Sequence, residues 1–247
     1  MTSFVARSPI AAPRAALYAW HARPGAFERL TPPGQRVRLV EDSGGIADGA
    51  RKVLAIGALG IRWVALHDGH VEGHRFRDVQ QRGPFRRWEH THTFLDDGPD
   101  RSILDDSVEY ELPLGRLGEL AAGWAIRRQL ARMFAHRQRV TRHDVELAAR
   151  EPAGCASLRI DREDCGEPRI RVVRAFLSAL GWSATPATSH AARAGSDTHL
   201  SVHISVQRDR AAIEAGGRRE VVPLLDESDA ALAALHRALR RFEAGAR

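Results

Sequence analysis

Residues 76–94 read FRDVQQRGPFRRWEHTHTF, and residues 106–112 read DSVEYEL. Side chains of two different kinds alternate along both stretches, and a period of two is typical of β-strands whose faces differ. One predicted face carries hydrophilic side chains, namely Arg75, Arg77, Gln81, Arg87, Glu89, Thr91, Thr93, Glu109 and Glu111. We expect this face to lie in water.

The opposite face combines aromatic rings with polar groups. It carries Phe76, Asp78, Gln80, Trp88, His90, His92, Phe94, Asp106, Val108, Tyr110 and Leu112. Because a buried polar group without a partner costs roughly 2–7 kcal/mol, the polar members must bond one another, hold water or face a cavity. Two interpretations follow: a polar network that satisfies itself under a helix, or a ligand cavity with aromatic walls and polar groups, the mixture typical of small-molecule sites.

Secondary structure is predicted on both sides of this face. The expected strands are Ser3–Arg7, Val37–Glu41, Ala50–Ile56, Ile61–His67, Gly73–Gln81, Arg86–Leu95 and Leu104–Leu112, and the expected helical segments are Ala12–Ala22, Gly25–Leu30 and Arg116–Arg139. Clusters of Gly, Asp and Pro favour turns, so the strands form an antiparallel meander. An apolar stripe runs along the last helix from Leu117 through Trp124 to Phe134. We expect this stripe to lie against the sheet, which makes the fold class α+β.

The histidines suit two kinds of chemistry. His90 and His92 project from one strand face at a spacing that suits metal chelation, but neither a cysteine ligand nor an HExxH helix accompanies them. No metal site is therefore predicted. A pair of His90 or His92 with Asp78 or Asp106 would suit acid–base catalysis if the strands are neighbours. No nucleophile or oxyanion loop accompanies such a pair.

Four segments stand in an informative order: YAWHARPGAFERLTPP (18–33), the stretch 76–94, DSVEYELPLGRLG (106–118) and FAHR (134–137). Over residues 1–142 the chain resembles the SRPBCC domain of the START and polyketide-cyclase superfamily, in particular the copy that precedes the epimerase domain in bacterial fusion proteins. The resemblance implies a helix-grip fold, in which a seven-stranded antiparallel sheet wraps a long C-terminal helix around an apolar ligand tunnel. It also implies binding of lipids, polyketides, quinones or other hydrophobic molecules, or, in a minority of members, cyclisation.

We expect a ligand site between the sheet and the long helix. Trp20 lies on the helix that resembles the family's entry helix, and Trp124 lies on the long helix. The predicted ligand-binding residues are Trp20, Phe76, Asp78, Gln80, Trp88, His90, His92, Asp106, Tyr110 and Trp124. The predicted function is the carriage or sensing of a small hydrophobic molecule such as a lipid, quinone or polyketide. The alternatives are a cyclase- or hydratase-type enzyme that uses the His/Asp groups, and a module that docks a partner.

Residues 146–247 are predicted to form a second, small α/β part, after a ligand-binding domain over residues 1–145. In the fusion proteins a glycine-rich dinucleotide loop would open the next domain. In the corresponding stretch, Ala156–Trp182, only Gly166 remains where several glycines are needed for the backbone to approach a pyrophosphate. NAD binding is therefore not expected, and no cofactor is predicted.

The second part has its own predicted elements. Ser157–Ile160 and Arg174–Gly181 are expected to be a strand and a helix, either of a degenerate or truncated dinucleotide-type domain or of an unrelated small domain. The other expected elements are strands at Thr198–Val206 and Glu220–Leu225, an amphipathic helix at Glu227–Phe242 capped by Asp226 or Ser228, and a flexible linker at Ser183–Asp197.

Composition excludes several classes of protein. The formal net charge is +6, but Lys52 is the only lysine, and an arginine-rich helix face explains the basic balance without a nucleic-acid partner. No run approaches the roughly 18 apolar residues of a membrane helix, and the first residues lack the pattern of a signal peptide. Cys155 and Cys165 form no zinc or disulfide pattern. A cytoplasmic protein is expected.

Overall fold

The computed structural model describes residues 1–247 apart from 33–34, 163–166, 187–200, 225–227 and 246–247. The chain divides into two compact units. The first unit consists of Met1–Ala22 and Leu30–Arg142, and the second of Arg23–Arg29 and His143–Arg247. None of the described helices combines the length and the apolar run that crossing a membrane requires.

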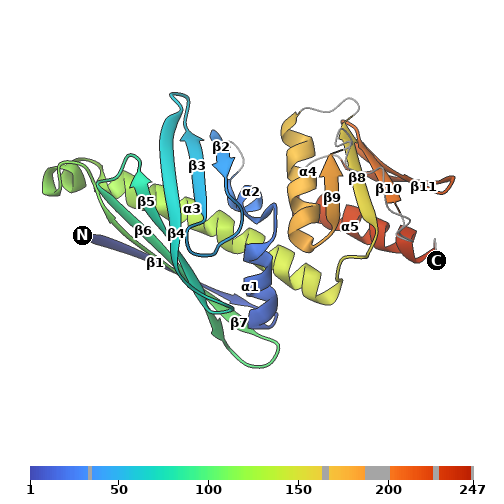
Figure 1. The fold of residues 1–247 in the computed structure, drawn as a ribbon, viewed down its shortest axis with the longest axis horizontal. Coiled ribbons are helices and arrows are strands. Elements are labelled where there is room, and N and C mark those ends of the chain that lie inside the picture. The colour runs from blue at the N-terminus through green and yellow to red at the C-terminus, as the bar shows by residue number, and fades with distance from the viewer. Residues whose placement is uncertain (33–34, 163–166, 187–200, 225–227, 246–247) are drawn as a thin grey trace. The chain divides into compact units, whose positions relative to one another are not determined.

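The first unit is a curved sheet with a long helix against it (Figure 1). Its elements are β1 (Thr2–Ile10), α1 (Arg14–Ala22), β2 (Val37–Asp42), β3 (Arg51–Ile56), β4 (Ile61–Val71), β5 (Arg75–Arg82), β6 (Arg87–Asp96), β7 (Ser102–Glu111) and most of α3 (Arg116–Arg150). The seven strands are ordered β1-β7-β6-β5-β4-β3-β2, and every neighbouring pair is antiparallel. The predicted helix-grip architecture is confirmed.

The predicted alternation of faces is confirmed in β6 and β7, whereas in β5 only Phe76 is buried. Along β7 every second residue from Ser102 to Tyr110 is buried, and β6 alternates in the same way from Trp88 to Phe94. The pairing register of the strands then determines which buried side chains lie opposite one another. Asp78 lies opposite His90, and His92 lies opposite Asp106. Because side chains directly across an antiparallel pair point to the same face, these four groups converge.

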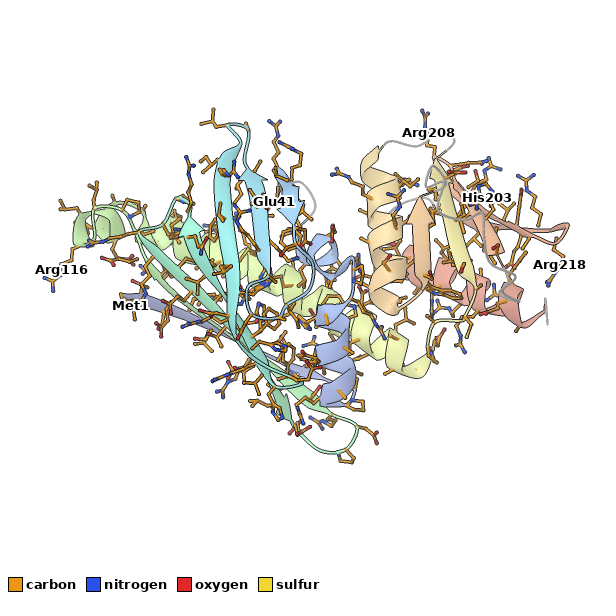
Figure 2. All side chains as sticks on the ribbon, viewed as in Figure 1. Met1, Glu41, Arg116, His203, Arg208 and Arg218 are labelled. Atoms are coloured by element: carbon orange, nitrogen blue, oxygen red, sulfur yellow. The ribbon has the colours of Figure 1, made fainter. Side chains whose placement is uncertain are left out.

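Helix α3 begins at Arg116 as predicted, but its length and the burial of its first turns differ from the prediction. It continues to Arg150, eleven residues past Arg139, and its first turns are exposed, with Leu120 at 88% and Trp124 at 69% exposure. The buried part of the apolar stripe begins only at Leu130, which joins Phe134 in the core cluster. Figure 2 shows Arg116 at the outer end of α3, directed away from the sheet.

The second unit is a mixed sheet with two main helices (Figure 1). Its elements are α2 (Ala26–Leu30), whose last residue belongs to the first unit, β8 (Ser157–Arg162), α4 (Glu167–Leu180), β9 (Ser183–Pro186), β10 (Ser201–Val206), β11 (Arg210–Ala215), β12 (Arg218–Pro223) and α5 (Asp229–Ala244). The strand order is β12-β11-β10-β8-β9. Strand β8 pairs in parallel with β9 and β10, whereas β10-β11-β12 is antiparallel.

The predicted strands at the positions of β8, β10 and β12 and the predicted helices at α4 and α5 are present, and Ser228 caps α5 by accepting from the Ala231 amide. Two strands were not predicted. Strand β9 lies in the stretch predicted as a linker, and β11 reads RAAIEA, an alanine-rich sequence of low strand propensity. Both segments are strands because they pair with neighbouring strands of the sheet. The predicted positions 187–200, Leu225, Asp226 and Glu227 lie outside the described residues.

An ion pair and a glycine hold the segment Arg23–Arg29 within the second unit. The guanidinium of Arg29 donates to both carboxylate oxygens of Asp144, at 2.9 and 2.8 Å, and to Asp229 at 3.2 Å. Gly25 has a φ of +88°, and a Cβ added there would lie 2.4 Å from the carbonyl oxygen of Ala175. Only glycine allows this close approach of the segment to α4.

We predict that Gly25→Ala lowers the free energy of unfolding by about 3 kcal/mol or more, since left-handed strain of about 1–2 kcal/mol adds to overlap with backbone atoms. Gly44→Ala is the matched control, because Gly44 has a φ of +86° and open space around it. Gly44→Ala should lower the free energy of unfolding only by the left-handed backbone strain. Urea unfolding followed by circular dichroism measures both, and equal losses would refute the close approach.

Candidate functional site

Four ionisable side chains from three adjacent strands form a compact cluster on the buried face of the first sheet. We call Asp78 of β5, His90 and His92 of β6 and Asp106 of β7 the His–Asp cluster. Asp78 Oδ2 lies 3.1 Å from His90 Nδ1 and 3.6 Å from His92 Nε2. Asp106 Oδ1 lies 3.2 Å from His90 Nε2 and 2.7 Å from His92 Nδ1. Each carboxylate therefore faces both imidazoles.

Burial and charge act in opposite directions on this cluster. Burial raises the pKa of Asp78, but the attraction and hydrogen bonds of His90 and His92 outweigh it and hold that pKa far below its usual range. The same balance lowers the pKa of Asp106. Burial lowers the pKa of His90, and the two carboxylates more than reverse this, so that the pKa is raised. The two carboxylates of the cluster therefore favour the protonated, cationic form of His90, which lies between them.

Three further ionisable groups surround the cluster, and sequence analysis did not select them. His21 comes from α1, with its ring 6.0 Å from that of His92. His67 of β4 lies opposite Asp78 in the strand register. Arg137 comes from α3, and its charge interacts with both Asp78 and Asp106. The spacing of Leu17 and His21 on one helix face, four residues apart, is the signal that would have identified His21 as buried.

The two outer histidines are neutral bases. Burial, followed by repulsion from His92, lowers the pKa of His21 to about 4. Burial also lowers the pKa of His67, although the charge of Asp78 opposes this. His21 Nδ1 donates to the carbonyl oxygen of Leu17 at 2.9 Å, so its Nε2 carries a lone pair.

Several buried polar atoms of this interior have no hydrogen-bond partner within the described part of the chain. They are His21 Nε2, His67 Nδ1, His92 Nδ1, Trp20 Nε1, Trp88 Nε1, the Tyr110 hydroxyl and Arg137 Nε. Each such atom costs about 1–3 kcal/mol when nothing replaces its hydration. The interior is therefore not a polar network that satisfies itself, which leaves water or a bound molecule to complete it.

Aromatic rings line the same interior. Phe76 stacks on His92 with ring centroids 4.2 Å apart, and Phe134 of α3 lies edge-on to His90 at 5.3 Å. Phe94 lies edge-on to His21 at 5.0 Å. Rings at these distances provide apolar contact around the charged groups. The arrangement combines an apolar wall with a small number of convergent polar atoms.

The predicted ligand-binding residues divide into two groups. The structure brings together the members of the sheet face, and Trp20, Phe76, Trp88 and Tyr110 are buried with them. Gln80 is half-buried, and its amide donates to the carbonyl oxygen of Phe85 at 2.8 Å. Trp124 differs from the expectation: its side chain is exposed, because α3 begins before its apolar stripe reaches the core.

The fold and the site together define a helix-grip domain with a polar and aromatic interior. A family model described as polyketide cyclase/dehydrase and lipid transport matches residues 10–135, just over half of the chain. The chain belongs to this family. Membership indicates hydrophobic-ligand binding or cyclase-type activity, and the matched segment contains the whole His–Asp cluster.

The chain is similar to several solved structures. A nucleoside-diphosphate sugar epimerase from Corynebacterium glutamicum is 27% identical over 74% of this chain and 38% of its own, with a TM-score of 0.59. The chain thus spans 38% of the length of that epimerase. A START superfamily protein from Mycobacterium smegmatis is 14% identical over 58% of this chain and 97% of its own, with a TM-score of 0.43. Norcoclaurine synthase from Thalictrum flavum is 14% identical over 56% and 85%, with a TM-score of 0.44. No curated protein sequence matches the chain.

We predict that His21 makes stability depend on pH. Its pKa of about 4 in the folded protein lies below the 6.5 of a free imidazole, so its contribution to stability is complete above the unfolded pKa and is lost as the pH falls toward 4. Between pH 7 and pH 5 the loss should be about 2 kcal/mol. Urea unfolding at both pH values should show a smaller pH dependence for His21→Gln than for the wild type.

The exposed His74 supplies the control for this measurement. His74→Gln should keep the pH dependence of the wild type, because an exposed imidazole is hydrated in both states. If His21→Gln and the wild type lose the same stability between the two pH values, the neutral, buried state of His21 is wrong.

Proposed function

We propose that the first unit binds a small hydrophobic molecule, such as a lipid, quinone or polyketide, and directs an oxygen-bearing group of it toward the His–Asp cluster. The proposal rests on one observation. Buried polar atoms within an aromatic interior lack protein partners in the described part of the chain. A ligand with an apolar body and a polar end supplies what both parts of this interior need.

The positions of the unpartnered atoms support a ligand with more than one hydrogen-bonding group. His21 Nε2 is an acceptor because the other nitrogen donates to Leu17. The ring nitrogens of Trp20 and Trp88 are donors only. A hydroxyl group satisfies the histidine, and a carbonyl or ether oxygen satisfies a tryptophan. A hydroxylated or keto-bearing polyketide or quinone therefore fits the interior better than a plain hydrocarbon.

A second candidate function is acid–base catalysis of the cyclase type. The observation that favours it is the pairing of each carboxylate of the His–Asp cluster with two imidazoles at 2.7–3.6 Å. A carboxylate behind a histidine orients the ring and stabilises its protonated form, which general acid–base catalysis requires. The neutral His21 beside His92 would supply a second base.

Binding is tested by tryptophan fluorescence. Titration with a fatty acid, a short-chain quinone and an aromatic polyketide analogue should give saturable quenching with at least one of them. Trp88→Phe should weaken that binding by about 3- to 10-fold, since a donor worth about 1 kcal/mol and part of the ring are lost. Trp124→Phe is the matched control and should bind like the wild type, because Trp124 is exposed. Absence of saturation with all three classes would refute the binding function.

Catalysis is tested on the same ligands by mass spectrometry after incubation. If the domain only binds, the ligands are recovered unchanged, and the double variant His90→Gln/His92→Gln weakens binding by about 1–2 kcal/mol through altered hydrogen bonds. If the domain is an enzyme, the wild type converts a ligand, and His90→Gln alone slows conversion by roughly 100-fold or more. The second result would show that the domain is an enzyme and would contradict the proposed carrier function.

A further inference from the structure

Three side chains of the His–Asp cluster present one donor atom each to a common point. They are Asp78, His90 and His92, and the three donor atoms lie within 4.8 Å of one another. Two neighbouring strands supply them. His90 and His92 are two residues apart on β6, and Asp78 lies opposite His90 on β5. Two imidazoles and one carboxylate form a donor set that binds divalent transition metals.

The separations suit a metal ion. A tetrahedral ion with bonds of about 2.0–2.1 Å has neighbouring donors about 3.3–3.4 Å apart, and an octahedral ion about 3.0 Å. Asp78 Oδ2 lies 3.1 Å from His90 Nδ1 and 3.6 Å from His92 Nε2. The two carboxylate–imidazole separations thus fall close to the required values.

Asp106 occupies the position of an orienting residue. Its Oδ1 lies 3.2 Å from His90 Nε2 and 2.7 Å from His92 Nδ1, the nitrogens that do not face Asp78. Histidines that bind metals commonly donate their other N–H to a carboxylate, which fixes the tautomer and the ring orientation. Here Asp106 forms this hydrogen bond with His90 Nε2, whereas His92 Nδ1 lies close to Asp106 without hydrogen-bond geometry, so its ring would have to reorient slightly to donate.

Two further buried histidines lie near the three donors. His67 lies opposite Asp78 in register, is 5% exposed, and its Nδ1 has no partner in the described part of the chain. His21 Nε2, beside His92, is likewise buried without a partner there. Neither histidine belongs to the group of donor atoms that lie within 4.8 Å of one another, so the protein supplies three ligands from Asp78, His90 and His92.

We propose that Asp78, His90 and His92 bind a divalent transition-metal ion, Zn²⁺ in the first place, and that Asp106 positions the two imidazoles. A divalent ion together with two carboxylates and Arg137 leaves an excess positive charge, so a further ligand of the ion should be an anionic oxygen such as a carboxylate, enolate or phenolate. The sequence prediction of no metal was based on the lack of a cysteine ligand and of an HExxH helix beside the histidines. The strand register places Asp78 opposite His90 and so supplies a third ligand.

Metal titration of the full chain, purified without a polyhistidine tag and stripped with chelator, tests this proposal without any organic ligand. Calorimetry with Zn²⁺ and visible spectroscopy with Co²⁺ should show one ion bound per first unit. Asp78→Asn and His92→Gln should each lower the affinity by 100-fold or more, and Asp106→Asn by roughly 10- to 100-fold. His74→Gln, at an exposed histidine, should leave it unchanged.

X-ray absorption at the zinc edge of the wild type keeps the test valid even if a variant fails to fold. Two imidazoles and oxygen around the ion support the proposal. A sulfur neighbour, which would indicate the exposed Cys155, overturns it. Affinity equal in the wild type and in folded His92→Gln, or no binding at all by the wild type, also overturns it.

Discussion

Asp106 is a buried carboxylate of the first unit and Asp78 a half-buried one, and the structure around them has to replace the water that they have lost. The penalty for burying such an ion is several kcal/mol even after relaxation. His90 and His92 stand between the two carboxylates and contact both, at 2.7–3.6 Å. Removing one member would leave another buried and unpaired, so the stability of each group depends on the other three.

This requirement determines the pairing of three strands. Asp78 must lie opposite His90 and Asp106 opposite His92, which the observed register achieves. A slip of one residue in β6 would turn both histidines to water and bring Glu89 and Thr91 inside. The hydrophilic outer face opposes the same slip, because Arg77 there pairs with Asp68 and Glu89. Register is therefore specified from both sides of the sheet.

The second unit is stabilised by a core of its own, and its sheet has a different topology from that of the first unit. Strand β8, helix α4 and strand β9 form a parallel βαβ unit, after which β10, β11 and β12 run antiparallel. Residues 163–166, where a phosphate-binding loop would lie in a dinucleotide fold, are outside the described residues. The buried pair of Arg29 with Asp144 and the close approach at Gly25 attach a short early segment of the chain to this unit.

Local patterns were sufficient to predict most elements of both units. Alternation identified the two faces of β6 and β7, Ser228 was one of the two predicted helix caps, and the two histidines and two carboxylates were selected because they share a face. Strands β9 and β11 were missed, because their residues have little strand propensity and depend on neighbours from elsewhere in the chain.

The sequence by itself determined which side chains share a face, since that follows from the backbone period of each element. Only the tertiary structure decided which faces meet. It placed His21 and Arg137, from two helices far apart in the sequence, against the His–Asp cluster, and it left Trp124 in solvent. The physical reason is that contacts between elements depend on strand register and on where a helix crosses the sheet, and neither is encoded in the periodicity of a single segment.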